Sequence, residues 1–511
     1  MKKNLALLLA LLMLLSGCKA SPDAALTGSD ENVSPQTGED GGANQDLGIA
    51  YVPEDIMHPL KTRNKLNLEL FGLIYEGLFE IDESFTARPV LCESFYLDNG
   101  SYYFKIRSGV LFGDGSSLTA RDAEYSLKLA KEQESYYANR LSGIKYIKAV
   151  DDTTLEVRID SQNGRLESLL DIPIVKSGSG DSFPAGTGAY SVWQNEDGIT
   201  LVARENWWKN ETPKFNHIKL YAVNNLDELI YNFESFNIDV ITMDSTGNPI
   251  RLRGDYETRD FGTTVMQYIG FNMKRDLFKD SLIRQAFSCL IDRESAAIQD
   301  FAGLAEPALL PLHPRCPAYS QDYAANIKYS VENAKSLFAA AGITDTDNDG
   351  RLDYGGRRRL PVTVSILVNR ENKSKTAVCH RIAEALKLLG IDAVVREEKW
   401  EDYLKALQKG DFDVYYAEVN LCPDFIIDPL FAALNYGGFP RGDFGVLLDG
   451  FNAAPLDKDN AQVKSFYMEF ALRVPFVPVL FKKNTIVTHR SFFETLTPTQ
   501  QNTYYAFSRW K

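Results

Sequence analysis

The sequence predicts an α/β fold whose central part is a parallel sheet covered by helices. The first observation is that residues 362–417 alternate three strand patterns with two helix patterns in the order β-α-β-α-β. Right-handed crossovers make the sheet of such a series parallel. The second is the length of 511 residues, which exceeds what one hydrophobic core supports and indicates two or three domains. The third is a composition of 44% hydrophobic and 24% charged residues, which is ordinary for globular proteins.

Each element of the series has its own signal. Alternating β-branched residues predict strands, and apolar stripes of helical spacing predict two helices, which end at Gly390 and Gly410. The residues concerned are, in order, Val362, Val364, Ile366 and Val368; Val378, Ile382, Leu386 and Leu389; residues 393–396; Tyr403, Leu404 and Leu407; and residues 412–416. Ligands of such sheets bind beyond the carboxyl ends of the strands, which indicates the segment after Tyr416.

Three further elements are predicted nearer the N-terminus. Large apolar residues at helical spacing predict a helix over residues 68–78. Strict alternation predicts a half-buried strand over residues 102–107. Thr119 and Asp122 have the spacing of a capping box and predict a helix that begins after Thr119.

The first 48 residues have the features of an export signal and a tether. Two lysines precede the apolar run Leu5–Leu15, which is too short to span a bilayer and suits a signal peptide. Leu15-Ser16-Gly17-Cys18 resembles the bacterial lipobox, whose cysteine is lipidated; an ordinary secretory signal with a chance cysteine is the alternative. We therefore expect a lipoprotein signal peptide at residues 1–17, and lipidated Cys18 with a polar, disordered tether at residues 18–48.

Charge and missing motifs narrow the function. With 69 acidic and 55 basic residues the chain has a net charge of −14, which disfavours nucleic acid as a partner. The sequence contains no phosphate-binding glycine motif, serine-hydrolase elbow or zinc-protease motif, so an enzyme is not expected. The five histidines are scattered and no C-x-x-C spacing occurs, so neither a cofactor nor a histidine- or cysteine-built metal site is expected.

One acidic segment resembles a calcium loop. Residues 345–350, Asp-Thr-Asp-Asn-Asp-Gly, copy the first six positions of an EF-hand loop, and Leu352 fits the apolar eighth position. The twelfth position is Gly356, where calcium loops supply a bidentate glutamate. A polar turn is therefore the favoured interpretation, and structural calcium is the alternative.

Several short stretches occur in the order in which one known family carries them. The most specific runs from Phe104 to Gly115 and continues through Leu118–Asp122 and Tyr125-Ser126. The others are Leu73–Leu78, Gly186–Tyr190, Asn206–Trp208, Phe271-Asn272, Ile283–Ala286 and Ile291–Arg293. Together they resemble the extracellular solute-binding proteins of the oligopeptide, dipeptide and nickel ABC importers, solute-binding protein family 5. The resemblance covers most of residues 47–511.

This resemblance implies a two-lobe, periplasmic-binding-protein-like (type II) α/β fold that encloses its ligand between the lobes. Lobe one would comprise residues 49–268 and 479–511, with a subdomain inserted at about residues 80–175. Lobe two would comprise residues 269–478, which contain the whole β-α-β-α-β series. Crossover strands would join the lobes near residues 267–272 and 475–481.

The resemblance also implies ligand-binding residues in lobe one. Tyr137, in the segment Ser135–Ala138, has the place of a tyrosine that contacts the ligand in peptide binders. A tyrosine packed on the subdomain surface is the alternative. Lys61 and Thr62 lie where the family has its first ligand-pairing stretch, and Thr62 is the candidate there.

In lobe two the chain departs from the family. Peptide binders carry W-x-x-D, whose aspartate grips the peptide's α-amine. Anchored on Pro423, Tyr416 takes the tryptophan place and Val419 the aspartate place. Nearby polar alternatives are Glu418, Asn420, Asp424 and Asp428. A buried ammonium needs a paired carboxylate, so Val419 implies a ligand that is amine-blocked, differently oriented or not a peptide.

We therefore expect a non-catalytic, monomeric, lipid-anchored substrate-binding component of an ABC importer, on the extracytoplasmic face of the bacterial cell membrane. It would capture peptides or peptide-like solutes, largely through backbone hydrogen bonds, and deliver them to a permease and its ATPase. One alternative is the same fold binding a nickel chelate, a sugar or another small molecule. The others are a ligand-sensing signalling lipoprotein and, disfavoured by the missing motifs, a surface hydrolase.

Overall fold

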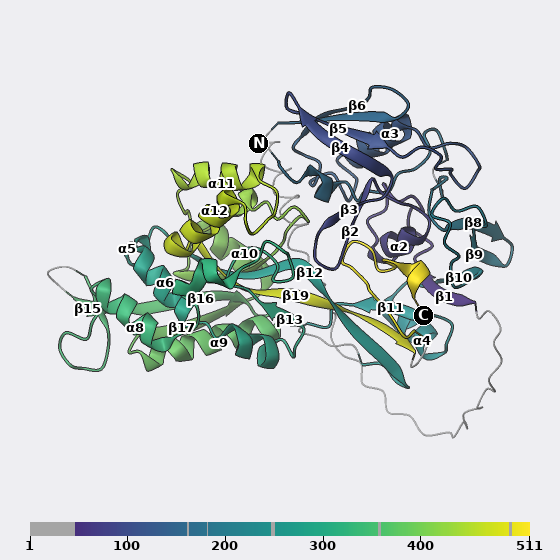
Figure 1. Ribbon diagram of the computed structural model, residues 1–511. Coiled ribbons are helices and arrows are strands. Elements are labelled where there is room, and N and C mark those ends of the chain that lie inside the picture. Colours follow the sequence, from purple (N-terminus) through teal and green to yellow (C-terminus); the bar gives the residue numbers. More distant parts are fainter. Residues whose placement is uncertain are drawn as a thin grey trace, which may run out of the picture.

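A large mixed sheet forms the centre of the molecule (Figure 1). The computed structural model describes residues 46–160, 163–180, 182–246, 251–355, 359–489 and 493–510. The predicted signal peptide, Cys18 and the tether up to residue 45 lie outside these residues, as does Gly356. The sheet has 11 strands, in the order β17-β16-β18-β12-β19-β11-β1-β10-β9-β8, and β13 pairs with β19.

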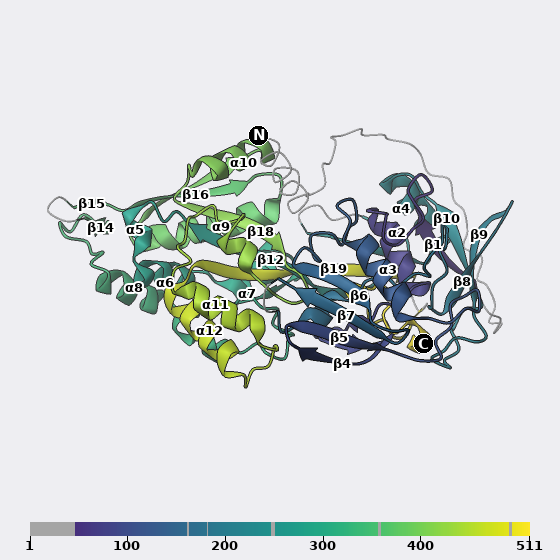
Figure 2. The ribbon, with the colours of Figure 1, turned by 90° about the horizontal axis from the view of Figure 1, so that it is seen from above.

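Two long strands, β12 (Tyr256–Phe271) and β19 (Phe476–His489), run between the two halves of the molecule (Figures 1 and 2). They are antiparallel, with Tyr256 opposite His489 at one end and Gly270 opposite Phe476 at the other. Their register shifts between Gly262 and Met266, and again between Gln267 and Tyr268. The pairing is therefore interrupted where the strands pass from one half to the other.

The β-α-β-α-β prediction is confirmed. Its elements are β16 (Thr363–Asn369), α9 (Lys373–Leu388), β17 (Asp392–Glu398), α10 (Trp400–Lys409) and β18 (Val414–Asn420). β16 pairs in parallel with both β17 and β18, so the two crossovers run in opposite directions and place α9 and α10 on opposite faces (Figure 1). The third strand continues beyond Tyr416, because residues 414–420 pair with β12.

The other half of the sheet and an inserted sheet come from the N-terminal part. The strands of the large sheet are β1 (Leu47–Tyr51), β8 (Tyr190–Asn195), β9 (Gly198–Ala203), β10 (His217–Ala222) and β11 (Val240–Met243), with helix α4 (Leu226–Glu234). A separate four-stranded sheet, in the order β4-β5-β7-β6, consists of β4 (Cys92–Asp98), β5 (Ser101–Ile106), β6 (Ile144–Ala149) and β7 (Thr154–Ile159). A short hairpin of β2 (Phe79–Ile81) and β3 (Ala87–Pro89) precedes it.

The local predictions in this part are confirmed with one correction. α3 (Ala120–Ala130) begins with the predicted capping box of Thr119 and Asp122, and β5 is the predicted half-buried strand. The helix expected over residues 68–78 is shorter: α2 covers Lys65–Leu70 and a 3-10 turn follows at Phe71–Leu73. Residues 74–78 are not helical, and the carbonyl of Leu78 accepts hydrogen bonds from the backbone N of Val90 and Cys92.

The remaining helices and strands belong to the second half. They are α5 (Asp276–Lys279), α6 (Ser281–Cys289), α7 (Arg293–Ser295), α8 (Val331–Ala340), α11 (Phe444–Ala453), α12 (Ala461–Arg473), β13 (Ala305–Pro307), β14 (Asp353–Tyr354) and β15 (Leu360–Pro361). The five described cysteines are free, and Cys289 and Cys379 are buried within helices as expected.

Two large hydrophobic cores divide the molecule. One is built from residues 47–261 and 486–510, and the other from residues 266–481 together with Ile81 and Phe85 of the β2–β3 hairpin. We call the bodies around these cores lobe one and lobe two. The hairpin lies across the boundary, because the Phe85 ring lies 4.3 Å from that of His313 and 5.6 Å from that of Phe425.

Candidate ligand-binding site

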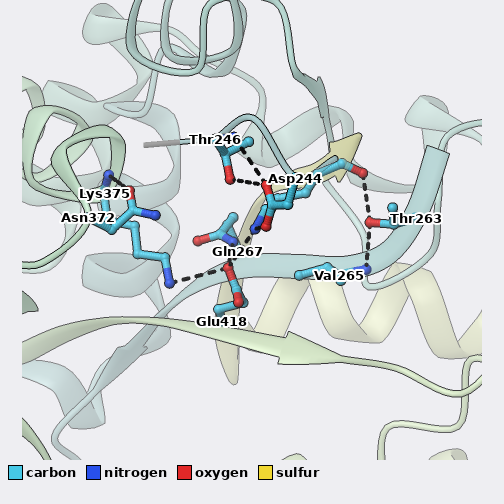
Figure 3. A network of polar contacts seen from close by, with 9 residues as sticks. Asp244, Thr246, Thr263, Val265, Gln267, Asn372, Lys375 and Glu418 are labelled. Carbon is cyan, nitrogen blue, oxygen red and sulfur yellow. Dashed lines mark hydrogen bonds and ion pairs between the residues drawn. The ribbon is translucent and has the colours of Figure 1, made fainter. Parts of the chain in front are cut away.

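Polar side chains of both lobes meet along the seam where β18 lies beside β12. The pairing places Glu418 opposite Gln267 and Val419 opposite Met266. Because side chains alternate along a strand, Glu418 and Val419 point to opposite faces of the sheet. Figure 3 shows the polar network that surrounds Glu418.

The negative charge of the Glu418 carboxylate is already balanced by positive charges within the protein. Gln267 Nε2 donates a hydrogen bond to Glu418 Oε2 at 2.5 Å, and the Nζ atoms of Lys375 and Lys482 lie 3.2 and 3.7 Å from the same oxygen. Burial would raise the pKa of Glu418, but the two lysines outweigh it and lower that pKa to about 2. An arriving ammonium group would therefore compete here with two lysines.

Lys482 joins the two lobes through one ammonium group. Its side chain, on β19, is only 7% exposed, and its Nζ lies 2.5 Å from Asp244 Oδ2 of lobe one. The other oxygen of Asp244 accepts hydrogen bonds from the backbone N and the hydroxyl of Thr246, at 3.1 and 2.6 Å (Figure 3). Burial lowers the pKa of Lys482, but Glu418 and Asp244 raise it above its usual range. We call the series Asp244–Lys482–Glu418–Lys375 the seam network.

Arg165 makes a second contact between the lobes beyond the end of β18. This lobe-one residue is 2% exposed, and its Nε donates to the backbone oxygen of Asp424 at 2.8 Å. Its Nη1 donates to the backbone oxygens of Phe451 and Ala454 at 2.6 and 2.7 Å. The guanidinium carbon also lies 4.5 Å from the centre of the Phe451 ring, within cation–π range. Arg165 is thus bound mainly by lobe-two backbone.

The side chain of Asp424 is a buried carboxylate held by neutral donors. Asn163 Nδ2 of lobe one donates to Oδ2 at 3.0 Å, and the backbone N of Ile426 donates to Oδ1 at 3.2 Å. Burial raises the pKa of Asp424, although Arg165 and these hydrogen bonds act in the opposite direction. Within the part of the chain that the structure describes, this carboxylate has no ion-pair partner within 4.0 Å.

Tyr137 and Asp424, predicted from two distant segments, come together around Arg140. Tyr137 is 8% exposed and lies three residues before Arg140, which forms an ion pair with Asp171. Burial lowers the pKa of Arg140, while nearby Cys422, Tyr137 and Asp424 raise it. The Nε atom of Arg140 has no hydrogen-bond partner among the described residues. The site therefore combines a buried carboxylate, a buried guanidinium and a tyrosine at the seam.

Three other predicted residues lie in packed positions. Tyr416 and Val419 are buried in the core of lobe two, and the backbone oxygen of Tyr416 accepts a hydrogen bond from the Tyr403 hydroxyl at 2.9 Å. Thr62 is fully buried and donates its hydroxyl to Asp55. A role of these residues in ligand binding stays a prediction.

Asn420 and Asp428 lie at the surface of the same region. The side-chain oxygen of Asn420 accepts hydrogen bonds from Thr264 Oγ1 at 3.0 Å and from Gln500 Nε2 at 3.2 Å. Asp428 accepts a hydrogen bond from Asn452 Nδ2 at 2.5 Å and lies 3.1 Å from Arg441. Asn420 is thus tied to the crossing strand, and Asp428 is already paired.

The sequence analysis missed the four cations of the seam: Arg140, Arg165, Lys375 and Lys482. Lys375 stands in the first turn of α9, where a lysine resembles any solvent-facing helical residue. Lys482 and Lys483 are adjacent in β19, and alternation alone leaves open which of them is buried. The partners of Arg165 lie 259 to 289 positions away, beyond the reach of any local pattern.

The acidic loop brings three carboxylates together. Oxygens of Asp345, Asp347 and Asp353 lie within 4.8 Å of one another, and Gly350 N donates to Asp345 Oδ2 at 3.0 Å, as in a tight polar turn. Asp353 instead accepts hydrogen bonds from Thr346. The twelfth position, Gly356, lies outside the described residues, so calcium binding stays a prediction.

Comparison with known proteins agrees with this geometry. The family model of the bacterial extracellular solute-binding proteins, family 5 (middle region), matches residues 86–437, which is more than half of the chain. The chain belongs to this family. Its members bind solutes outside the cytoplasm, so the expectation of a binding protein that is not an enzyme is confirmed.

Relatives resemble this solute-binding protein over most of its length. The oligopeptide-binding protein AppA of Bacillus subtilis is 24% identical over 522 residues, which cover 94% of this chain and 93% of AppA. Heme-binding protein A of Haemophilus influenzae is 23% identical over 429 residues, or 74% of this chain and 75% of the relative.

Solved structures show the same fold. The nickel ABC transporter protein of Bacillus halodurans has a TM-score of 0.73 at 18% identity and covers 90% of this chain and 98% of its own. The unliganded open form of the murein tripeptide-binding protein MppA has a TM-score of 0.71 at 18% identity, over 90% and 95% of the two chains. The predicted two-lobe α/β fold is thereby confirmed. Among the described helices, none has both the length and the apolar character needed to cross a membrane.

The seam network yields a prediction for Lys482. Lys482→Met removes the cation shared by Asp244 and Glu418, and should lower the free energy of unfolding by about 1–3 kcal/mol, since each carboxylate loses a charged partner. The ligand-free variant should also show a larger radius of gyration in small-angle X-ray scattering. Lys483→Met is the matched control, because Lys483 is the next residue and the one hydrogen bond of its Nζ among the described residues goes to the backbone oxygen of Gly303. Equal effects of the two substitutions would contradict the bridging role of Lys482.

Glu418 gives a second prediction, which concerns pH. Its pKa is about 2 in the folded protein and about 4.3 in an unfolded chain, so the charged form stabilises the fold. This contribution is complete above pH ~4.3 and is lost as the pH falls towards about 2. The difference in melting temperature between the wild type and Glu418→Gln should shrink over this range. The exposed control Glu93→Gln should differ little from the wild type in melting temperature at every pH. A difference between Glu418→Gln and the wild type that does not change with pH would refute the stabilising ion pairs of Glu418.

Proposed function

We propose that the protein is the lipid-anchored substrate-binding component of an ABC importer, and that it captures peptides or peptide-like solutes at the seam between its lobes and delivers them to a permease. The observation that carries this proposal is the buried Asp424 carboxylate, whose contacts are neutral hydrogen-bond donors. Such a carboxylate gains most from a ligand that brings a positive charge, as the α-ammonium of a peptide does. The relatives named for oligopeptides and for a murein tripeptide support the same class of ligand.

Asp424, rather than Val419 or Glu418, is therefore our candidate for the amine-binding carboxylate. Val419 is buried in the core of lobe two, and Glu418 is neutralised by two lysines. Asp424 comes one residue after Pro423 and five after Val419, so this assignment departs from the family motif and depends on the burial and contacts of Asp424. Tyr137 and Arg140 would contact the same ligand from lobe one, the latter through its unpartnered Nε.

Ligand capture in this proposal is a closure of the two lobes. A ligand that touches both Asp424 and Tyr137 binds the closed form more tightly than the open form and therefore shifts the population towards closure. The two separate hydrophobic cores support the proposed division into lobe one (residues 49–268 and 479–511) and lobe two (residues 269–478). The separate sheet of β4–β7 supports a subdomain at about residues 80–175.

The amine receptor is tested with matched peptides. A ligand that co-purifies with the protein can be identified by native mass spectrometry. If none is found, a peptide library is screened by the shift in melting temperature. A peptide present at 100 times its dissociation constant should raise the free energy of unfolding by about 2.7 kcal/mol. The wild type should bind a free-amine peptide at least tenfold more tightly than its N-acetylated form, about 1.4 kcal/mol. Asp424→Asn should abolish this preference, and Glu418→Gln should leave it intact.

The pH dependence of binding has a definite sign. Burial raises the pKa of Asp424, so acid first removes the charge that the amine needs. The affinity for the free-amine peptide should therefore fall as the pH is lowered, and the affinity for the N-acetylated peptide should not. Equal affinities of the two peptides in the wild type would refute Asp424 as receptor and return the ligand to the amine-blocked or non-peptide classes.

The proposed anchor is tested separately. Cys18→Ala should abolish metabolic labelling with palmitate and leave the protein unprocessed or released from the membrane, because the lipid is attached to that cysteine. Cys92→Ala, at a buried cysteine of the folded body, is the control and should keep the label. Continued acylation of Cys18→Ala would overturn the lipobox interpretation.

A further inference from the structure

Lobe one contains a partly open cavity of about 260 Å³ that is distinct from the seam network. All of its lining residues lie between Leu68 and Pro213 or between Gln501 and Arg509, and apart from Ile81 of the β2–β3 hairpin, which packs in the lobe-two core, they belong to lobe one. Tyr137 and Asp171 are the only lining residues that also belong to the cluster around Arg140. Most of the cavity wall is therefore independent of the relative position of the lobes.

Two buried donors that line the cavity have no hydrogen-bond partner among the described residues. They are the hydroxyl of Tyr75, which is 4% exposed, and the Nε1 of Trp207, which is 8% exposed. Burial raises the pKa of Tyr75 well beyond neutral pH, so its hydroxyl stays protonated and able to donate. The neighbouring Trp208 differs, because its Nε1 donates to Glu76 Oε2 at 2.7 Å. Buried polar groups are nearly always hydrogen-bonded, so two such donors beside a cavity indicate an occupant with acceptors.

Acceptors for a bound molecule lie in the same wall. Gln501 Oε1 has no hydrogen-bond partner in the described part of the chain. Glu80 makes no ion pair there, and burial, more than the opposing effect of Lys209, raises its pKa. The cavity therefore offers both donors and acceptors to the edge of one molecule.

The charges of the cavity wall are largely balanced. Glu76 Oε1 lies 3.0 Å from Lys209 Nζ, and Glu76 Oε2 accepts a hydrogen bond from Thr187 at 2.9 Å. Asp171 and Glu211 pair with Arg140 and Arg509, and the remaining acidic lining residue, Glu80, has a pKa that burial raises. Because an unpaired charge in such a site is strongly disfavoured, the wall favours a neutral occupant.

Size and ring content restrict the occupant further. An apolar cavity of about 150 Å³ holds one benzene molecule, so 260 Å³ holds one or two fused rings. Aromatic rings make up much of the wall; they belong to Phe71, Phe79, Trp207, Trp208, Tyr504, Tyr505 and Phe507. Trp208 is fixed as a platform by Glu76 and by the Arg107 guanidinium, 5.3 Å from its ring centre. Flat rings stack favourably on such surfaces.

We propose that this cavity is a second binding site, and that it takes a flat, neutral heterocycle of one or two fused rings whose edge carries carbonyl oxygens and N–H groups. The carbonyl oxygens accept from Tyr75 and Trp207, and the N–H groups donate to Gln501 and Glu80. The site does not depend on the proposed transport ligand, since Asp424 is not among the residues that line it.

Binding of model compounds to the full chain tests this site. Uracil and hypoxanthine are the probes, glucose is the polar but non-flat control, and benzene is the apolar control. Titration calorimetry should show one saturable site for at least one heterocycle, with unchanged affinity in Asp424→Asn. Absence of heterocycle binding, binding of benzene alone, or equal binding of glucose would each overturn the proposal.

Conservative variants connect the binding to the two donors. Tyr75→Phe removes the hydroxyl and keeps the ring, whereas Trp207→Phe removes the indole N–H together with the five-membered ring, and each should weaken heterocycle binding about tenfold. Tyr231→Phe and Trp193→Phe, at residues 68% and 55% exposed, are matched controls that should bind as the wild type does. Without a probe, Tyr75→Phe should melt no lower than the wild type, because the lost donor has no hydrogen-bond partner among the described residues. A lower melting temperature of Tyr75→Phe would mean that ordered water satisfies this donor, and would also overturn the proposal.

Discussion

The pairing of β12 with β19 is the constraint on which the rest of the molecule depends. These strands belong to both halves of a single 11-stranded sheet, so the lobes cannot separate without breaking the ladder. The ladder is regular at its two ends and shifts register between Gly262 and Met266. Rotation of one lobe against the other is most easily absorbed where the ladder is interrupted, because few strand hydrogen bonds must deform there. Gln267 and Lys482 lie close to this interruption, so their contacts with Glu418 depend on the local geometry of the two strands.

Burial of charge at such a seam is tolerated because the charges alternate. Asp244, Lys482, Glu418 and Lys375 follow one another with opposite signs, and each inner member has a partner on either side. An isolated buried charge would cost several kcal/mol, whereas an alternating series recovers much of that cost through its neighbours. The series also crosses from lobe one to lobe two, so its full stabilisation requires one relative position of the lobes. The ion pairs of the seam network therefore depend on the relative position of the two lobes.

Local patterns predicted the architecture much better than the site. The strands and helices of residues 362–417 follow from alternation and helical spacing, which depend only on neighbours in sequence. The sequence predicts that the strand containing Glu418 ends at Tyr416, which is four residues too early. The polar residues at its end resemble a loop, and only their pairing with residues 265–268 shows that they belong to the strand. Arg165 could not be recognised at all, since its partners are backbone oxygens of residues 424, 451 and 454, which no side-chain pattern encodes. Sequence patterns thus predict the helices and strands that neighbouring residues determine, and miss contacts between residues that are distant in sequence.

The chemistry of the second cross-lobe contact explains how such a protein can remain ready to open. An apolar interface of similar extent would hold the lobes together by a non-directional hydrophobic effect that no ligand could easily influence. Arg165 instead contacts three backbone oxygens and one aromatic ring, and it loses its hydration when it does so. The free-energy cost of desolvating a guanidinium offsets much of the stabilisation from these contacts. Closure without ligand is then only weakly favoured or disfavoured. In that regime a ligand needs to supply only a few kcal/mol of differential binding to decide the equilibrium, and a buried carboxylate such as Asp424 is the kind of group that supplies it.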